Sequence, residues 1–432
     1  MNKKQAYAAI AVTLAVLAFG ASYLNSADLF LRLLLGLGLG FALTKGSIGF
    51  AGSVNRAYRR GSTKLIQILM FLFIVTCIIN AGLMFNAQPG EYNLWIRPIN
   101  LGLVVGGILF GAGMSLSSCC ASGVMVEMVD DIPRAFITLI FFGAGVFFGM
   151  PLQSTQSWIK QSLISTESYA GKGVFLPDLF SWDPMNGYFF SVLLSIAFGL
   201  TVIYFARKYQ QSCEKNGTYL GVPGEQLRDK VAMEPKPQIE KFWSVESYQR
   251  WVGNVWQMRT AALMIAIIVA IMMVATGSGW GASTPYGLWF GKLLMAFGVE
   301  PAQIAAFTHK PEAMFTKPVL ANPVGLQNLA ILAGTLITVL FMGKFTLSLN
   351  KGYTLKHYSL FALGGFMMGF GTRFSNGCNV GALFTPVANF SLSGWIFLVV
   401  LIAGGILGNR LQAWVLNTQS KKLCVETTKA TH

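Results

Sequence analysis

Eleven apolar runs follow one another along this 432-residue chain, and most of them are long enough to cross a lipid bilayer. A helix needs about 20 apolar residues to span a membrane. Charged residues make up only 11% of the chain, whereas an ordinary soluble domain contains about 25%. This pattern predicts an all-α, polytopic transmembrane protein and excludes a soluble enzyme, a disordered tail and a secreted module stapled by disulfides. The runs cover residues 6–24, 29–44, 64–86, 99–126, 134–154, 186–206, 259–277, 284–299, 326–342, 358–383 and 391–416.

The distribution of lysine and arginine predicts which loops face the cytoplasm, because cytoplasmic loops of membrane proteins are enriched in these residues. The stretches 45–64, 207–258 and 344–357 are rich in them, whereas 87–98 and 155–185 are poor. We therefore expect the first three stretches inside and the last two outside. The net charge of +15 is attributed to this topology and to contact with anionic lipid, and no nucleic-acid partner is expected.

Two of the apolar runs are short, and each contains a charged residue. The runs 29–44 and 284–299 include Arg32 and Lys292, respectively. We interpret both runs as re-entrant half-helices that enter and leave the membrane on one side, which leaves about nine spans. This count puts the N-terminus outside, and ten or eleven spans are the open alternatives.

The chain divides into two membrane halves around one polar stretch. Residues 207–258 contain scattered prolines and charges of both signs, and we interpret them as a cytoplasmic linker. The first transmembrane half then covers residues 1–206 and the second covers 259–432. Each half contains one copy of a repeat unit, at about 29–150 and about 287–409.

A self-match joins the two halves. Residues 106–125 read GGILFGAGMSLSSCCASGVM, and residues 364–383 read GGFMMGFGTRFSNGCNVGAL. At an offset of 258, without a gap, five glycines and one cysteine of the first segment fall on the same residue types in the second. The matched pairs are Gly106 and Gly364, Gly107 and Gly365, Gly111 and Gly369, Gly113 and Gly371, Cys120 and Cys378, and Gly123 and Gly381.

The predicted sides make the two copies inverted, since the first motif runs from outside to inside and the second from inside to outside. Many transporters built from inverted repeats bind substrate at the repeat interface near the membrane midplane. Glycines let helices pack closely, and irregular backbone is tolerated at this depth only where protein covers it or water lines it. We therefore expect Cys120 and Cys378 to face each other along a pathway.

The side chains around the second motif indicate an anionic substrate. Arg373 lies inside an apolar run, five residues before Cys378, and an arginine at membrane depth marks a functional site by default. Its planar guanidinium suits an oxyanion, although a structural role in holding loose backbone carbonyls is the alternative. Asn376 and Asn379 flank the cysteine and either donate to the same oxyanion or cap the turn. A thiol beside an arginine and amides suits a small anion that contains sulphur.

The other cysteines leave a second class of function open. Cys119 has no counterpart, because position 377 is glycine, and Cys77 is interpreted as a small buried apolar residue. Two or three thiols could bind a soft ion such as Cu(I), so a membrane redox or soft-metal-handling protein is the alternative of another class. None of the three histidines lies near either motif, and no CxxC occurs. We therefore expect no metal and no other cofactor.

These segments resemble the YeeE/YedE family of sulphur-transport membrane proteins. The resemblance rests on GILFGAGMSLSSCCASG at 107–123 and GFGTRFSNGCNVGALFTPVANFSLSGW at 369–395, and LWFGKLLMAFGVEP at 288–301 is similar to the selenium-linked YedE branch. It implies an inverted-repeat fold with short re-entrant helices, and thiosulfate uptake in which path cysteines pass the ion inward through S–H contacts. Two such cysteines match Cys120 and Cys378. A third family cysteine belongs in the first loop, where this chain reads KGSIGFAGSVNR and has none.

The combined prediction is a multi-pass transporter of the bacterial inner membrane that imports a small sulphur-containing anion, with thiosulfate as the leading candidate. A selenium species or another sulphur compound is the alternative cargo. No enzymatic activity is expected, and no GxxxxGK[ST] motif for ATP is present. Besides the anion and membrane lipid, the resemblance alone implies a cytosolic sulphur-carrier protein as partner. The predicted pathway residues are Cys119, Cys120, Gly123, Arg373, Asn376, Cys378, Asn379 and Gly381.

Overall fold

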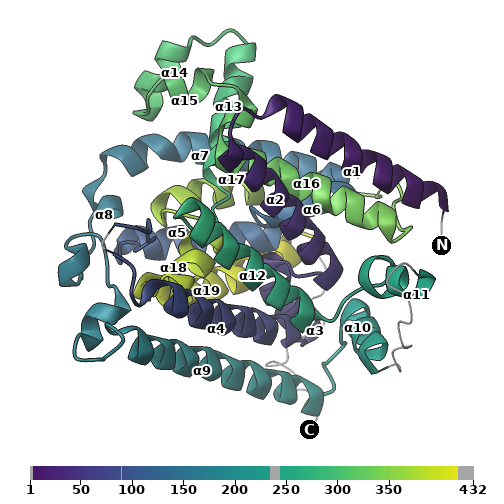
Figure 1. Ribbon diagram of the computed structural model, residues 1–432, viewed down its shortest axis with the longest axis horizontal. Helices are drawn as coiled ribbons and strands as arrows, with labels where there is room; N and C mark the ends of the chain where they lie inside the picture. Colours follow the sequence, from purple (N-terminus) through teal and green to yellow (C-terminus); the bar gives the residue numbers. More distant parts are fainter. Residues whose placement is uncertain (1–2, 89, 234–243, 348, 350, 417–432) are drawn as a thin grey trace.

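The computed structural model describes residues 3–88, 90–233, 244–347, 349 and 351–416. Helices dominate, and no β-strand occurs in this part of the chain (Figure 1), which confirms the predicted all-α membrane fold. The long helices are α1 (Lys3–Tyr23), α2 (Ala27–Gly46), α4 (Lys64–Met84), α5 (Leu101–Ser117), α7 (Ile132–Thr155), α9 (Tyr188–Lys215), α12 (Met258–Thr276), α16 (Pro323–Phe341), α17 (Leu355–Phe374) and α19 (Leu392–Val415).

Shorter helices connect these long ones and complete the repeat units. They are α3 (Phe50–Arg60), α6 (Gly123–Asp130), α8 (Ser157–Lys160), η1 (Glu167–Tyr169), η2 (Leu176–Phe180), α10 (Pro223–Met233), α11 (Val245–Tyr248), η3 (Gln249–Gly253), α13 (Thr284–Ala296), α14 (Pro301–Thr308), α15 (Ala313–Thr316), η4 (Val319–Ala321), η5 (Asn379–Phe384) and α18 (Thr385–Ala388). At the sequence offset of 258, α5 and α6 correspond to α17 and to η5 with α18.

Eight helices among the described residues are long and apolar enough to cross a membrane, against the nine spans predicted. The difference has two parts. First, α2 is 20 residues long and forms part of a continuous apolar candidate span, so the run 29–44 is not a short half-helix. By contrast α13, in the run 284–299, has 13 residues. Second, neither α5, which has 17 residues, nor α17 is among the eight.

The three stretches rich in lysine and arginine gather at one end of the molecule, which we call the basic end. The Arg56 guanidinium pairs with Glu225 of α10 at 3.0 Å, and the Tyr248 hydroxyl donates to the Phe341 carbonyl at the end of α16. In Figure 1 the N-terminus, α10 and α11 lie together at the right, whereas α8 lies at the left. The loops 87–98 and 155–185, which are poor in these residues, lie at the opposite end.

The N-terminus also belongs to the basic end. The Gln5 amide donates to the Phe345 carbonyl and accepts from the Phe345 N–H, at 2.9 and 3.2 Å. Phe345 lies in the stretch 344–357, which the charge pattern predicts inside. The prediction of an N-terminus on the other side from this stretch is therefore wrong. Its cause is the treatment of α2 as a half-helix, because a crossing α2 returns the start of α1 to the basic end.

The glycine motifs pack the two copies against each other. A Cβ atom on Gly106 would lie 2.7 Å from the Gly371 carbonyl oxygen, and one on Gly113 would lie 2.4 Å from that of Gly364. Residue numbers therefore rise along α5 as they fall along α17, so the two helices are antiparallel. Such close backbone contact requires residues without a side chain.

The other glycines of each motif contact a third and a fourth helix in the same way. A Cβ on Gly111 would lie 2.2 Å from the Leu401 carbonyl oxygen of α19, and one on Gly369 would lie 2.1 Å from that of Phe142 on α7. Helix α5 thus packs on α17 and α19, whereas α17 packs on α5 and α7. The helices of the two copies occupy equivalent, inverted positions around the centre.

Candidate functional site

Each cysteine motif follows a helix that ends in a left-handed residue. Ser118 has φ 54° after α5 and Asn376 has φ 56° after α17, and these positions differ by the repeat offset of 258. A left-handed residue is a common way to end a helix, and for a residue with a Cβ it costs about 1–2 kcal/mol. Helix α5 ends at Ser117 and α17 at Phe374, and the left-handed residue lies two residues before each cysteine, where the glycine spacing predicts loosened backbone.

The two cysteines share one backbone hydrogen bond after the helix end. The Val124 N–H donates to the Cys120 carbonyl, and the Ala382 N–H donates to the Cys378 carbonyl, each at 2.7 Å. The Gly123 N–H donates to the Cys120 sulphur at 3.2 Å. The Cys378 sulphur accepts from the equivalent Gly381 N–H and from that of Val380.

Gly123 leaves the Cys120 sulphur the room for this arrangement. A Cβ on Gly123 would lie 2.9 Å from that sulphur. Both thiols are enclosed, with 1% of Cys120 and none of Cys378 exposed. Each sulphur therefore accepts from backbone N–H groups, and that of Cys120 also lies 3.6 Å from the Ser122 hydroxyl oxygen.

Tyr286 joins the two motifs, and no sequence pattern marks it. Its hydroxyl donates to the Ala121 carbonyl at 2.7 Å, and it lies within electrostatic range of both Cys120 and Cys378. The thiols are likewise within electrostatic range of each other. Tyr286 is one residue of an apolar helix start, and only the packing of α13 between the motifs reveals its position.

Arg373 is buried beside Cys378 without an acidic partner among the described residues. Only 4% of the residue is exposed, and its guanidinium donates to the Ser283 hydroxyl at 3.0 Å and to the Gln153 side-chain carbonyl at 3.4 Å. The Cys378 thiol lies within its electrostatic range. The positive charge is thus surrounded by neutral side chains rather than by the backbone carbonyls of the structural alternative.

The two predicted asparagines have different positions. Asn379 lies in the centre, where its amide donates to the Met114 sulphur at 3.2 Å and its side-chain oxygen is buried without a partner. Asn376 instead accepts from the Gln153 amide at 2.8 Å and donates to the Ile159 carbonyl. Asn376 therefore holds the end of α17 against α7 and α8, in line with the capping alternative.

Cys119 has no counterpart for a steric reason. At the equivalent position, a Cβ on Gly377 would lie 2.4 Å from the backbone carbonyl carbon of Gly381, so no cysteine fits there. Cys119 is 1% exposed and lies within electrostatic range of Glu127 and Arg134 as well as of Cys120.

A cavity of about 150 Å³ at the basic end leads to the first motif. It lies between the loop 45–56 and the segment 118–130, and Ser47 lines it in the loop where the resemblance implies a third cysteine. Arg56, Cys119, Cys120 and Glu127 line it as well.

Two arginines at this end, Arg56 and Arg134, have acidic partners. Arg134 pairs with Glu127 and, at 3.3 Å, with Asp131, and the Asp131 carboxylate accepts from the Tyr353 hydroxyl at 2.5 Å. Burial raises the pKa of Glu127, although Arg134 opposes this effect. Burial, together with the bond to Asp131, raises the pKa of Tyr353 to about 12.

The described residues contain no group of three or more His, Cys, Asp and Glu side chains placed to hold a metal ion. The donor set suits an anion instead. Thiols are weak hydrogen-bond donors that match a sulphur atom, and the guanidinium matches oxygen atoms. An anion that carries both kinds of atom satisfies Cys378 and Arg373 together.

Comparison with known proteins agrees with this chemistry. The family model described as sulphur transport matches residues 45–407. The chain is 25% identical over 386 residues to the thiosulfate transporter TsuA of Spirochaeta thermophila, covering 89% of this chain and 98% of that protein. It is 23% identical to TsuA of Escherichia coli, over 86% of this chain and 91% of that protein. The probable transporter YedE of Escherichia coli is 27% identical over 160 residues, 37% of this chain and 39% of YedE.

Proposed function

The chain belongs to the sulphur transport family, and we propose that it imports thiosulfate across the bacterial inner membrane. The family and the relatives are transporters, not enzymes. Two relatives that match most of the chain are thiosulfate transporters by name. The proposal adds the path of the ion through the protein, the inward direction of transport and the inner membrane as its location.

The buried charge of Arg373 is the observation that carries the proposal. An arginine at the membrane centre costs at least about 2.5–3.5 kcal/mol on insertion scales, and the neutral partners of Arg373 do not neutralise its charge. An anion bound there would neutralise it. The adjacent Cys378 thiol would then select, among small oxyanions, one that presents a sulphur atom.

The proposed path runs from Cys378 past Tyr286 to Cys120 and then into the cavity at the basic end. The N–H groups of Gly381 and Gly123 donate to the two sulphurs, and each S–H would donate to the terminal sulphur of thiosulfate, that of Cys120 in place of its contact with the Ser122 hydroxyl. No covalent bond to the ion is needed. Cys119 would contact the ion only after Cys120, because it lies within electrostatic range of Glu127 and Arg134.

The exit from this path differs from that of the family pattern. Ser47 lines the cavity and offers a hydroxyl in the loop where the resemblance implies a cysteine. A hydroxyl donates more strongly to oxygen than to sulphur, so we propose that the ion turns its oxygens toward this loop as it leaves. Membrane lipid and a cytosolic sulphur-carrier protein at the basic end belong to the same proposal.

Growth on thiosulfate as sole sulphur source, in a bacterium without its own uptake systems, tests the proposal. The wild-type chain should restore growth, and Cys378→Ala and Arg373→Gln should not, at equal membrane expression. Cys77→Ala is the matched control, because Cys77 is equally buried but donates to the Val387 carbonyl away from the arginine. Failure of the wild type would reject thiosulfate and favour a selenium or other sulphur species.

A further inference from the structure

Three basic side chains, Arg97, Lys160 and Lys310, lie toward the end of the molecule opposite the basic end, and Arg373 is buried below them beside Cys378. We call these four side chains the entry cluster. The Trp95 ring, over which the Arg97 guanidinium lies, would be 2.6 Å from a Cβ on Gly281, and Ser283, two residues further on, accepts from Arg373. Arg97 and Lys310 therefore both act electrostatically on Arg373, and Lys160 acts on Lys310. The salt bridges in the described part of the chain involve Arg32, Arg56, Lys64 and Arg134, and none involves the entry cluster.

Arg97 is held over the second cysteine motif by Trp95. Its guanidinium carbon lies 4.6 Å from the centre of the Trp95 ring, and the indole N–H donates to the Ser278 hydroxyl at 3.2 Å. The same ring covers Gly381, where a Cβ would lie 3.2 Å from it. Arg97 is therefore fixed on the outer side of the loop that contains Cys378.

The Nε–H group of the Arg97 guanidinium lacks a hydrogen-bond partner. Its Nε atom is buried and makes no hydrogen bond. An unsatisfied buried donor costs about 1–3 kcal/mol, and more when it is charged. The charge of Arg97 is thus incompletely compensated, like that of Arg373, and the two like charges repel each other.

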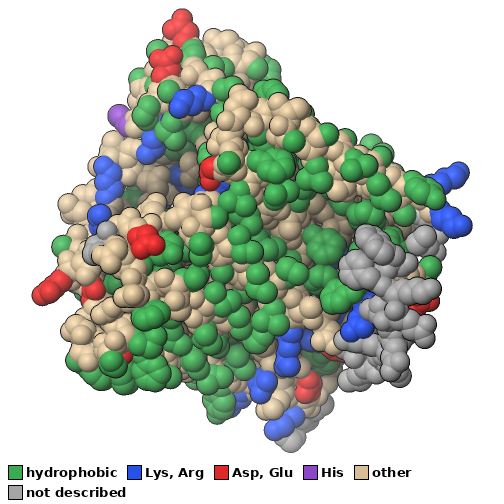
Figure 2. Space-filling model, in the orientation of Figure 1, with side chains coloured by type: hydrophobic (Ala, Val, Ile, Leu, Met, Phe, Trp, Pro, Cys, Tyr) green, Lys and Arg blue, Asp and Glu red, His purple; other side chains and the backbone are tan. Residues whose placement is uncertain are grey.

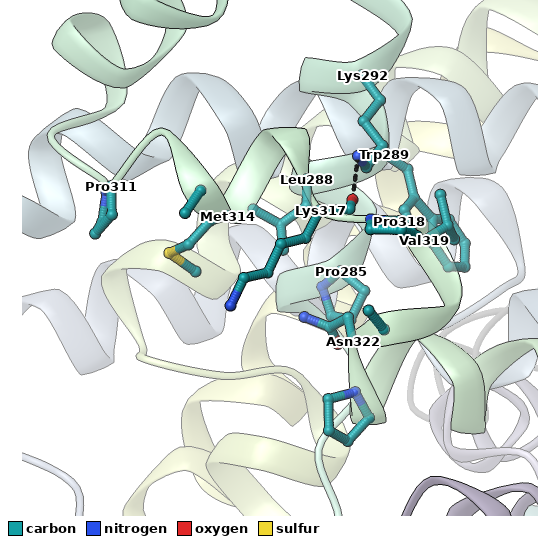
Figure 3. A pocket seen from close by; sticks show the side chains of 13 residues that line it. Pro285, Leu288, Trp289, Lys292, Pro311, Met314, Lys317, Pro318, Val319 and Asn322 are labelled. Carbon is teal, nitrogen blue, oxygen red and sulfur yellow. Dashed lines mark hydrogen bonds between the residues drawn. The ribbon is translucent and has the colours of Figure 1, made fainter. Parts of the chain in front are cut away.

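A hollow begins next to Lys310, because the following residue, Pro311, lines it. A cavity of about 400 Å³ is lined by residues of α13, α15 and the segment 317–323, and Figure 3 shows Lys292 and Lys317 on its walls. The Lys292 ammonium donates to the carbonyls of Phe315 and Lys317, which holds this wall in place. Figure 2 shows lysine and arginine side chains around a hollow near the α13–α15 segment.

We propose that Arg97 and Arg373 together form an external anion site that takes a dianion, and that Lys160 and Lys310 draw the dianion toward it. This site rests on the proposed function, because it precedes Cys378 on the same path. Two uncompensated guanidinium groups need two negative charges, and a cleft lined by one sign of charge concentrates ions of the other sign. A tetrahedral sulphur oxyanion offers enough oxygens for both forks.

The site and the thiols then form two filters in series. The two arginines select charge and oxygen atoms, whereas the two thiols select a terminal sulphur. Sulfate carries the charge and the oxygens but no terminal sulphur. It should therefore compete at the arginines without being transported, whereas nitrate, a monoanion, should compete weakly.

Uptake of radiolabelled thiosulfate into liposomes containing the purified protein tests this site. Sulfate should inhibit uptake by the wild type at concentrations at least about tenfold lower than nitrate does, because one charged hydrogen bond corresponds to roughly that factor. Arg97→Gln should raise the half-saturating thiosulfate concentration by at least about tenfold and abolish the difference between sulfate and nitrate. Arg97→Lys keeps the charge but lacks the planar guanidinium. Its half-saturating thiosulfate concentration and its preference for sulfate over nitrate should therefore lie between those of the wild type and Arg97→Gln.

The control is Arg207→Gln, which removes an arginine that donates to Gln67 away from the entry cluster and should change neither quantity. Equal inhibition by nitrate and sulfate, or an Arg97→Gln variant that behaves as the wild type, would overturn the two-arginine site. If the wild type takes up no thiosulfate, the two-arginine site can still be tested by thermal unfolding of the purified protein with added sodium sulfate. Sulfate that stabilises the wild type but not Arg97→Gln supports the site although the proposed cargo has failed, and sulfate without effect on the wild type rejects it.

Discussion

The two cysteine motifs share a left-handed helix end and one backbone hydrogen bond, and they differ in the charged side chains around them. Ser118 and Asn376 end their helices in the same left-handed conformation, and the same hydrogen bond closes the turn after Cys120 and after Cys378. Beside the first motif, Arg134 is paired with two carboxylates. Beside the second, Arg373 has only neutral partners among the described residues.

The contrast indicates that the repeat gives both motifs the same helix packing, which we call the shared frame. The side chains that differ between the two copies would set the direction of transport. At the offset of 258, Arg373 replaces Ser115 and Thr385 replaces Glu127. In the proposed path, Arg373 would stabilise an anion at the second motif. At the first motif, the carboxylates that neutralise Arg134 would repel the anion and favour its release.

The strongest effect should come from removing the charge that distinguishes the second motif. Arg373→Gln should lower the initial rate of thiosulfate uptake by about a hundredfold or more, because a buried charged contact to the ion is lost. Initial rates in membrane vesicles measure this. An uptake rate within about threefold of the wild type would contradict a direct contact between Arg373 and the ion.

The shared frame can be disturbed in both copies alike. Gly111→Ala and Gly369→Ala should each lower the free energy of unfolding by about 1–3 kcal/mol, because the new methyl group overlaps a carbonyl of the neighbouring helix. Gly82→Ala is the matched control, since nothing lies within 4 Å of a Cβ there. Thermal unfolding in detergent measures the difference. If all three variants unfold at the same temperature, the close helix contacts at Gly111 and Gly369 do not contribute measurably to stability.

Removing the paired arginine should affect folding more than substrate recognition. Arg134→Gln leaves Glu127 without its partner and Asp131 with only the Tyr353 hydroxyl, so stability should fall by about 1–3 kcal/mol. The half-saturating thiosulfate concentration should stay within about threefold of the wild type, because Arg134 is already neutralised. Both quantities are measured on the same purified sample. A large loss of affinity with unchanged stability would show that Arg134 binds the ion.

The smallest expected effect is a difference in stability between glycine substitutions at the two helix ends. Ser118→Gly should raise stability by up to about 1 kcal/mol, because glycine adopts positive φ without strain. Asn376→Gly gains the same relief but loses the hydrogen bonds to Gln153 and Ile159, so its net effect should be near zero or negative. Unfolding temperatures compare the two. Equal gains would mean that the Asn376 side chain contributes nothing.

The frame could be predicted from the sequence because its signal is local and repeated. Apolar run lengths indicate helices, and the matched glycines mark the places where two helices touch. The breaks before Cys120 and Cys378 were also predictable, since both motifs follow glycine-rich helices. The reason for the glycine at position 377 was not, because only the fold brings the backbone of Gly381 within 2.4 Å of a Cβ there.

The errors and omissions concern residues whose partners are distant in sequence. Arg32 suggested that the run 29–44 does not cross, yet its guanidinium donates to the Gln327 side chain of α16 at 3.2 Å, which lets a charged residue lie within an apolar helix. Tyr286 and Arg97 carry no local signal either. Their roles arise from α13 packing between the motifs and from Trp95 lying on Gly381, and neither contact follows from spacing.

A thiosulfate path through the second motif is tested most directly by a time course of radiolabelled thiosulfate accumulation in liposomes that contain only this purified protein. Such a path predicts saturable accumulation by the wild type and by Cys77→Ala, and none above empty liposomes by Cys378→Ala. Accumulation that is equal with and without the Cys378 thiol, or absent from the wild type, would contradict it.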